Sequence, residues 1–115
     1  MIKHISIIQR PAGMSREEHV DYWLNVHAPL IRRTSPRLKR YVINLAVPSP
    51  EGYKTSPCDG IVETCFEDMQ SYLLARSDPS WLSAERKESS KRVIDFRRFQ
   101  NYLVEEHVIP LNEES

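Results

Sequence analysis

The sequence has few of the residues on which several large protein classes depend. Only three glycines occur among its 115 residues, so there is no glycine-rich loop to cradle the phosphates of ATP, NAD or FAD. Lysine plus arginine number 16, as do aspartate plus glutamate, so no net charge attracts nucleic acid or anionic lipid. No apolar stretch approaches the roughly 20 residues that cross a bilayer. We therefore expect neither a nucleic-acid nor a membrane partner.

Cysteine is also scarce. Cys58 and Cys65 are the two thiols, and the second falls inside an expected strand that begins just after the first. Seven extended residues span roughly 23 Å, whereas a disulfide needs Cα atoms within about 7 Å. The apolar run within residues 1–10 is interrupted by basic side chains, and no small-residue cleavage site follows it, so we expect no signal peptide. These features favour a soluble cytoplasmic protein with unpaired thiols.

The four histidines do not form a metal-binding pattern. Only His19 and His27 share one regular element, and they are two helical turns apart, too distant to hold one ion unless the chain bends. Two thiols without a clustered histidine also fall short of a four-ligand zinc site. We therefore predict no metal.

Strand and helix patterns alternate along the chain. Ser15 followed by Glu18 is a capping box that begins a first helix, and Asp68 caps a second, which ends near Ala75 and restarts at Asp78-Pro79 to carry Trp81 and Leu82. Strands are predicted at residues 2–8, 41–47, 61–66 and 99–108. The order β-α-β-β-α-β predicts an α+β, ferredoxin-like fold. With no repeat or linker, residues 1–115 form a single domain.

The first helix has one apolar face, which is interrupted by a proline. Pro29 cannot donate to the carbonyl of Asn25 and crowds it, so the helix should kink or loosen at His27. A carbonyl and an imidazole would then face a cavity. The residues of this face recur at three- and four-residue steps: Val20, Trp23, Leu24, His27 and Ile31.

The predicted sheet is apolar on both faces. In the second strand Tyr41, Ile43 and Leu45 point one way, while Val42 and Ala46 point the other way with Asn44. Helices cover only one face of such a sheet, so the other face should bind a second copy of the chain. The loop at residues 48–57, rich in proline and serine, is either a flap over a site or ordinary surface.

Several blocks of residues resemble the EthD domain family. They are Trp23-Leu24-Asn25-Val26-His27-Ala28-Pro29-Leu30, Tyr41-Val42-Ile43-Asn44, and Asp59-Gly60-Ile61-Val62-Glu63 with Phe66. The resemblance spans nearly the whole chain. That family belongs to the dimeric α+β barrel superfamily. The resemblance therefore implies a homodimer whose two sheets form a barrel, with a ligand cleft in each subunit between sheet and helices.

The resemblance also implies a chemistry. The family is similar to methylmuconolactone methylisomerase and to fungal polyketide-tailoring dehydratases and decarboxylases, which work without metal or organic cofactor. Their mostly apolar pockets contain a few polar groups that move a proton on an aromatic or lactone-like substrate. We therefore expect a cofactor-independent lyase or isomerase that acts on a small aromatic, polyketide or lactone metabolite in catabolism or secondary metabolism.

His27 is the candidate catalytic residue. Its unperturbed pKa lies near neutrality, so an imidazole can accept and return a proton at working pH. The alternative is a satisfied core or interface histidine. Tyr22, Trp23 and Tyr41 are candidate lining residues of the pocket, although aromatic residues at such positions also serve as core.

Two polar strand residues are candidates for substrate binding. The amide of Asn44 needs a hydrogen-bond partner, which is either a ligand carbonyl or neighbouring backbone. Glu63, if it points to the helix side in place of Thr64, would be an acid partner of His27 with a raised pKa. Otherwise it forms a salt bridge to an arginine across the dimer.

Two other functions remain compatible with the sequence. A pocket with one histidine is enough for an accessory protein that carries a hydrophobic metabolite for a degradative oxygenase system. Related barrels also include cofactor-free monooxygenases, which oxidise phenolic polyketides to quinones. Binding without conversion would indicate the first function, and oxygen uptake the second.

Overall fold

A four-stranded antiparallel sheet forms the centre of the computed structural model, which describes residues 1–112. Its strands are β1 (Ile2–Ile8), β2 (Arg40–Leu45), β3 (Gly60–Phe66) and β4 (Gln100–Glu105), in the spatial order β2-β3-β1-β4. Both central strands are antiparallel to their neighbours. The predicted α+β architecture and element order are thereby confirmed.

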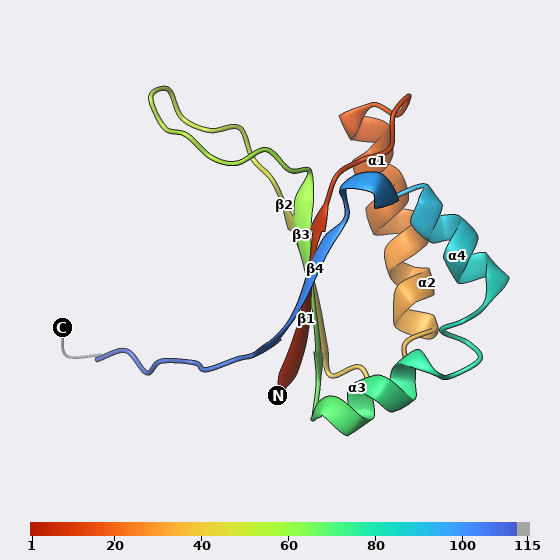
Figure 1. The fold of residues 1–115 in the computed structure, drawn as a ribbon. Coiled ribbons are helices and arrows are strands. Elements are labelled where there is room, and N and C mark those ends of the chain that lie inside the picture. The colour runs from red at the N-terminus through yellow and green to blue at the C-terminus, as the bar shows by residue number, and fades with distance from the viewer. Residues whose placement is uncertain (113–115) are drawn as a thin grey trace.

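All helices lie on one side of this sheet (Figure 1). The first helical region is continuous and has three parts, α1, the π-helical η1 and α2, and the second region contains α3, α4 and the short 3-10 helix η2. Their bounds are α1 Arg16–Tyr22, η1 Trp23–His27, α2 Ala28–Arg33, α3 Met69–Arg76, α4 Ala84–Lys91 and η2 Phe96–Arg98. Among the described residues, no helix is long and apolar enough to cross a membrane.

Side-chain caps begin the helices where the sequence predicted them. The amide of Glu18 donates to Ser15 Oγ at 3.1 Å, and the Ser15 amide donates back to Glu18 Oε1 at 3.3 Å, which completes the capping box. Asp68 Oδ1 accepts from the Ser71 amide at 2.8 Å and starts α3. Local chemistry therefore fixes both starting points.

Helix α4, the second helix after β3, begins later than predicted. Trp81 and Leu82 lie in a turn, and α4 starts at Ala84 with Ser83 as its N-cap. The Asp78 carboxylate accepts from the Ser80 amide at 2.9 Å, a local bond that competes with helix formation. With this turn, the indole of Trp81 packs against the core cluster of Phe66 and Tyr72.

Two strands are shorter than predicted because their partners end. β2 stops at Leu45, which pairs with Gly60, the first residue of β3. β4 stops at Glu105, which pairs with Ile2 at the start of β1. The next amides, of Ala46 and Glu106, still donate to the Asp59 and Met1 carbonyls at 3.1 and 3.5 Å, but the ladder goes no further within the described residues. The extended patterns to residues 47 and 108 therefore do not continue as strand.

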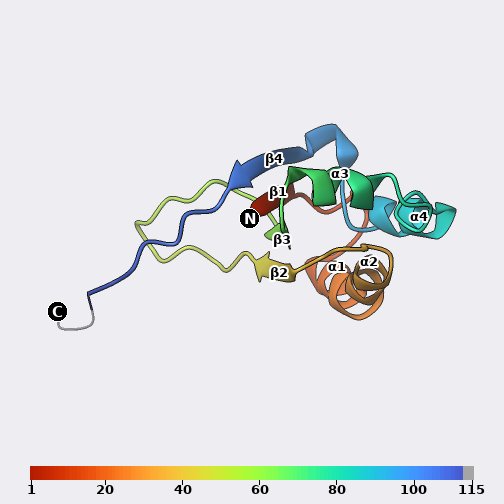
Figure 2. The same cartoon turned by 90° about the horizontal axis from the view of Figure 1, so that it is seen from below.

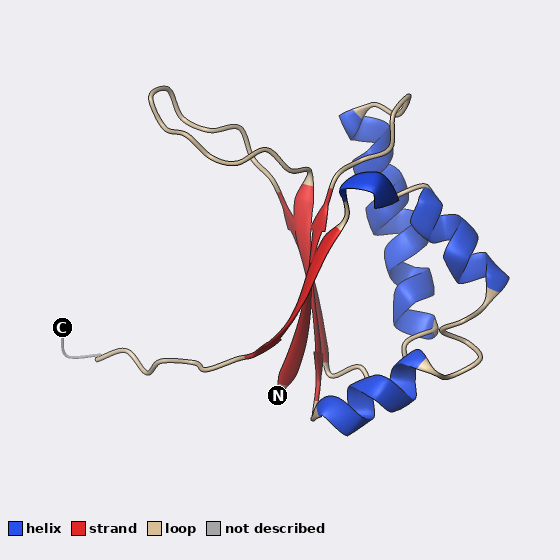
Figure 3. Ribbon diagram, viewed as in Figure 1, coloured by secondary structure: helices blue, strands red, loops and turns tan. Residues whose placement is uncertain are grey.

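The core lies between the sheet and the helices in two clusters. One contains Trp23, Ile8 and Val93, and the other is built around Phe66 and Tyr72. Figures 2 and 3 show the segment between β2 and β3 and the chain after β4 extending from the helix-free side of the sheet. In this structure the loop at 48–57 therefore does not cover the space beneath the helices.

Candidate functional site

A cavity of about 390 Å³ lies between the sheet and the helices. Strand alternation sends every second residue of β1 into it, namely His4, Ser6 and Ile8, together with Val62 and Thr64 of β3. The helical layer supplies the opposite wall, and its cavity-facing residues include His27, Ile31, Arg86 and Ser90. The volume lies within the range of small-molecule sites.

His27 lies at the point where the first helix widens. The amide of Ala28 donates to the carbonyl of Trp23, five residues back, and Pro29 follows as an early residue of α2. The π-helical turn thus accommodates the proline that cannot continue the α-helical bonding pattern, as the sequence predicted. The imidazole is 5% exposed and lines the cavity.

A chain of two hydroxyl groups leads away from His27. Its Nδ1 lies 2.8 Å from Ser89 Oγ, and the Tyr22 hydroxyl donates to the same Oγ at 3.1 Å. Because Ser89 Oγ accepts from Tyr22, its own hydrogen is available to donate to His27 Nδ1, an arrangement in which the ring proton lies on Nε2. Ser89 is the buried link in this chain, whereas Tyr22 also borders an outer hollow beside α4.

The imidazole is held in its neutral form. Burial, with a smaller contribution from the positive charge of Arg86, lowers the pKa of His27 to about 4. Tyr41 also lines the cavity, and burial raises the pKa of its phenol to about 12. Both rings are therefore uncharged at neutral pH, and each offers hydrogen-bonding atoms in a largely aromatic space.

Arg86 is one of two arginines that line the cavity, and it was not among the residues predicted from the sequence. Its Nη1 donates to the carbonyl and hydroxyl oxygens of Thr34 at 3.1 and 3.2 Å and to Ser35 Oγ at 2.9 Å. Its guanidinium carbon lies 3.8 Å from the ring centroid of Trp81. In sequence, residues 85–92 look like a solvated polar helix. The available signal was the spacing of Arg86, Ser89, Ser90 and Val93 on one helix face.

His4 is a second cavity histidine to which the sequence analysis assigned no role. Its Nε2 lies 3.2 Å from Asn101 Oδ1, and both residues line the cavity. Burial lowers the pKa of His4, partly opposed by its bond to Asn101. The signal that could have found it was its alternation with Ser6 and Ile8 along β1.

The predicted lining residues are only partly brought together. Trp23 and Tyr41 line the cavity with His27, as expected. Tyr22 packs against the core cluster of Trp23, borders an outer hollow and is joined to His27 through Ser89. It is not among the described residues that line the cavity.

Asn44 and Glu63 lie on the helix-free face of the sheet, away from His27. Thr64 takes the cavity side of β3, so alternation sends Glu63 the opposite way. Glu63 accepts from Lys3 Nζ at 2.6 Å and from Asn44 Nδ2 at 2.8 Å, and Asn44 also donates to the Ile61 carbonyl at 3.0 Å. These bonds lower the pKa of Glu63, opposite to the rise expected of an acid partner.

The same helix-free cluster includes a second carboxylate, because Lys3 also donates to Glu106. Lys3 thus bridges Glu106 and Glu63 within one chain. Both cysteines are free thiols, as predicted. Across residues 1–112, no three His, Cys, Asp or Glu side chains are grouped so that they could hold a metal ion.

This architecture is similar to that of several solved structures. An ethyl tert-butyl ether d (ethd) family protein from Bacillus halodurans is 26% identical, with a TM-score of 0.68 over 93% of this chain and 99% of that one. A protein from Arabidopsis thaliana is 13% identical, with a TM-score of 0.66 over 96% and 100%. A protein from Bacteroides fragilis, described as dimeric and ferredoxin-like, is 11% identical, with a TM-score of 0.53 over 90% and 91%. No match was found among curated proteins.

The fold and cavity together define a ferredoxin-like α+β domain with a site between sheet and helices. The model of the EthD domain matches residues 11–97, which is most of the chain. The protein therefore belongs to the EthD family. The assignment to this family, which rested on the sequence blocks that begin at Trp23, Tyr41 and Asp59, is confirmed.

Proposed function

We propose that the protein is a cofactor-independent lyase or isomerase that transfers a proton on a small aromatic, polyketide or lactone metabolite. The observation that carries this proposal is the environment of His27. A neutral imidazole borders an aromatic cavity on one side, and on the other it is bonded to a buried hydroxyl. An imidazole anchored in this way can exchange a proton with a ligand.

The hydroxyl chain allows His27 to act in both directions. With Tyr22 donating to Ser89 and Ser89 donating to Nδ1, Nε2–H is a donor to a substrate oxygen. When Nε2 gives its proton to the substrate, Nδ1 takes the proton of Ser89, Ser89 takes that of Tyr22, and Tyr22 takes one from solvent. The ring then carries Nδ1–H, and Nε2 is a base. Tyr22 borders the outer hollow, so the chain connects the imidazole with solvent.

Arg86 supports this chemistry by its charge. Removal of a proton next to a carbonyl produces an enolate or phenolate, and a fixed guanidinium in a dry cavity stabilises that oxygen. The new negative charge also offsets the effect of Arg86 on His27, so the pKa of the imidazole rises toward neutrality in the complex. A base with a low resting pKa is thereby strengthened in the transition state, where this negative charge develops.

The test compares wild type with His27→Ala, using His107→Ala as the control because His107 is exposed and lies outside the cavity. Thermal shifts are measured with muconolactones, hydroxyanthrones and simple phenols, and stabilising compounds enter turnover assays. We expect wild type and His107→Ala to convert one class, and His27→Ala to lose at least about 100-fold in rate. Equal turnover by all three proteins would refute the role of His27.

A binding function is the second candidate, favoured by the absence of any carboxylate from the described lining of the cavity. Saturable binding of a metabolite without conversion, with or without the partner oxygenase, would identify an accessory protein for a degradative system. Conversion of a phenol that consumes oxygen, and that stops when dioxygen is removed, would instead identify a cofactor-free monooxygenase.

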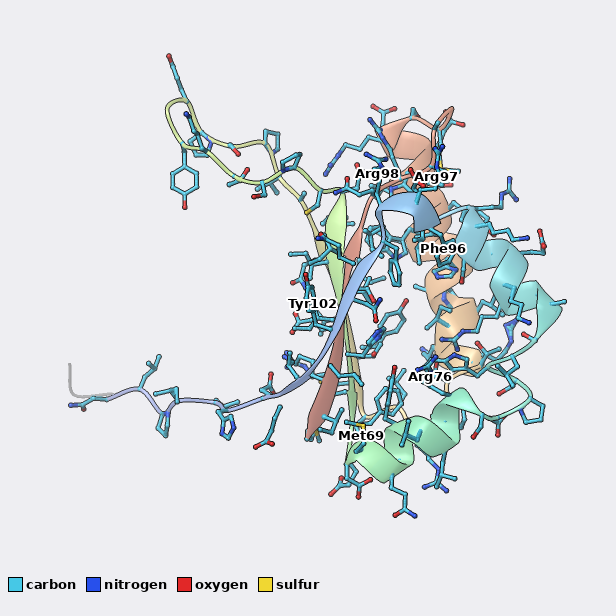
Figure 4. The ribbon with its side chains drawn as sticks, viewed as in Figure 1. Met69, Arg76, Phe96, Arg97, Arg98 and Tyr102 are labelled. Carbon is cyan, nitrogen blue, oxygen red and sulfur yellow. The ribbon has the colours of Figure 1, made fainter. Side chains whose placement is uncertain are left out.

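We also propose a homodimer formed through the helix-free face of the sheet. On this face, apolar and aromatic side chains surround the hydrogen-bonded cluster of Lys3, Asn44, Glu63 and Glu106. They are Ile5, Ile7, Val42, Ile61, Tyr102 and Val104. Figure 4 shows Tyr102 on this side, opposite Phe96 and Arg76.

The free thiols of Cys58 and Cys65 support a reducing, cytoplasmic location, which cell fractionation would test.

A further inference from the structure

Arg86 forms no ion pair among the described residues. The carboxylates of residues 1–112 that form ion pairs do so with other partners, among them Lys3, Arg10, Arg33 and Arg98. All its hydrogen bonds to described residues are made by Nη1, and all go to uncharged oxygens of Thr34 and Ser35. The Nε and Nη2 donors of the same fork thus have no partner in the described part of the chain.

The space beside Arg86 has the lining expected for an aromatic anion. Arg76 and His4 also line it, whereas none of the lining residues is an aspartate or a glutamate. The pKa values of both cavity histidines, His4 and His27, are lowered mainly by burial and in part because Arg86 repels their protonated forms. The remaining wall is largely aromatic and includes Trp23, Tyr41, Tyr72, Trp81, Phe96 and Phe99.

A half-buried cation without a countercharge is costly, and an anionic ligand would remove that cost. Burial lowers the pKa of Arg86 to about 10, with only the phenol of Tyr41 opposing the change. A guanidinium presents paired donors in one plane, a geometry that matches the two oxygens of a carboxylate. Because Trp81 stacks on Arg86, the plane of the fork is fixed before a ligand arrives.

We propose that the cavity binds an aromatic organic acid as its anion, with the carboxylate or ionised phenol oxygen on Arg86 and the ring among the aromatic side chains. This inference rests on the proposed function in placing the reacting part of the ligand beside His27. Arg86 then selects the charged form of the ligand, and its position sets which ring atom lies next to the imidazole.

The test uses two ligands of nearly equal shape, 2-naphthoate and the uncharged 2-naphthamide. Binding is measured at pH 7 by calorimetry and located by the indole N–H signals of NMR spectra. The chain has two tryptophans, and both line the cavity, but Trp81 also borders a second hollow beside α4. A shift of the Trp23 indole signal therefore places the ligand in the cavity, whereas a shift of the Trp81 signal alone would place it in that second hollow. We expect wild type to bind the acid roughly 10- to 100-fold more tightly than the amide.

Three variants separate charge from packing. Arg86→Gln should lose most of the preference for the acid and retain binding of the amide, whereas Arg86→Lys should retain a reduced preference. Arg92→Gln is the matched control, since Arg92 also stacks on an aromatic ring, that of Tyr22 at 4.8 Å, but lies outside the cavity. Circular dichroism and melting curves show that each variant is folded.

The outcomes distinguish this inference from the proposed function. Equal affinity of wild type for acid and amide, or an acid preference that survives Arg86→Gln, would overturn the inference and leave the role of His27 standing. Full competition by equimolar sulfate would also overturn it, because the site would then recognise a bare anion. If the acid binds through Arg86 but turnover does not depend on His27, the inference stands and the proposed catalytic role fails.

Discussion

At the scale of single residues, Ser89 decides what His27 can do. A buried imidazole with one nitrogen in a cavity and the other on a hydroxyl has its tautomer set by that hydroxyl. Ser89 is 4% exposed, so no solvent replaces its bond to Nδ1. The chemistry of the cavity therefore depends on a residue that does not need to touch the ligand.

We predict that Ser89→Ala and Tyr22→Phe change the tautomer of His27. In wild type the ring proton should lie mainly on Nε2, and loss of either hydroxyl should move a substantial share of it to Nδ1. Nitrogen-15 spectra of the imidazole measure both populations. Tyr102→Phe, on the other face of the sheet, is the control and should leave the spectrum unchanged. Identical wild-type and Ser89→Ala spectra would contradict the relay.

A second prediction follows from the lowered pKa of His27. Its pKa is about 4 in the folded chain and about 6.5 in the unfolded chain, so the unfolded chain binds a proton first as pH falls. Stability is therefore lost from about pH 6.5 down to about pH 4, by an amount on the order of 3 kcal/mol. Urea unfolding at each pH measures the free energy of unfolding, and His27→Gln should lack this part of its decrease. If the free energy of unfolding falls with pH equally in wild type and variant, His27 is not the cause of the loss.

The residues that could be predicted from sequence are those with a local signal. Pro29 two residues after His27 was sufficient to predict a loosened helix, because a proline affects the carbonyl four residues earlier. Glu63 and Thr64 could not be assigned to faces, since alternation gives their opposition but not its direction. Arg86 was missed because its burial comes from packing of α4 on distant segments of the chain.

At the scale of elements, Gly60 explains how β3 and the first helix come together. A Cβ at this position would lie 2.6 Å from Trp23 Cη2 and 2.7 Å from the Asn44 carbonyl oxygen. The strand therefore needs glycine where the indole packs on it. The neighbouring Asp59 accepts from the Arg10 amide at 2.8 Å and fixes the entry into the strand.

Gly60→Ala should therefore destabilise the protein by about 1–3 kcal/mol, the usual cost of overpacking. Denaturant unfolding measures this cost. In a Trp23→Leu background the indole contact is absent, so the same substitution should cost less, while the carbonyl contact keeps the rescue partial. An equal cost in both backgrounds would show that the indole does not determine the effect.

Element boundaries were less predictable than element types. The caps at Ser15 and Asp68 were read correctly because they are bonds between residues three apart. The ends of β2 and β4 were placed too late, since a strand ends where its partner ends, and pairing of Leu45 with Gly60 is not visible in a local pattern. Long-range pairing is thus what single-sequence reasoning lacks.

At the scale of the whole molecule, the two faces of the sheet have different tasks. One face holds the cavity with its aromatic and basic lining. The other combines apolar side chains with a cluster in which Lys3 pairs with both Glu63 and Glu106. A second copy that covers this face would bury these groups as ion pairs rather than as isolated charges.

We predict that wild type has twice the 13.5 kDa mass of one chain by light scattering, and that Ile61→Lys is monomeric. Ile61 lies in β3 between Asn44 and Ile7 on the helix-free face, so the dimer would bury an unpaired lysine from each copy. In a monomer that lysine is hydrated and costs little. Leu74→Lys is the control, because Leu74 is an exposed residue of α3 and should leave the dimer intact. A monomeric wild type, or a dimer that persists in Ile61→Lys, would show that this face does not join two copies.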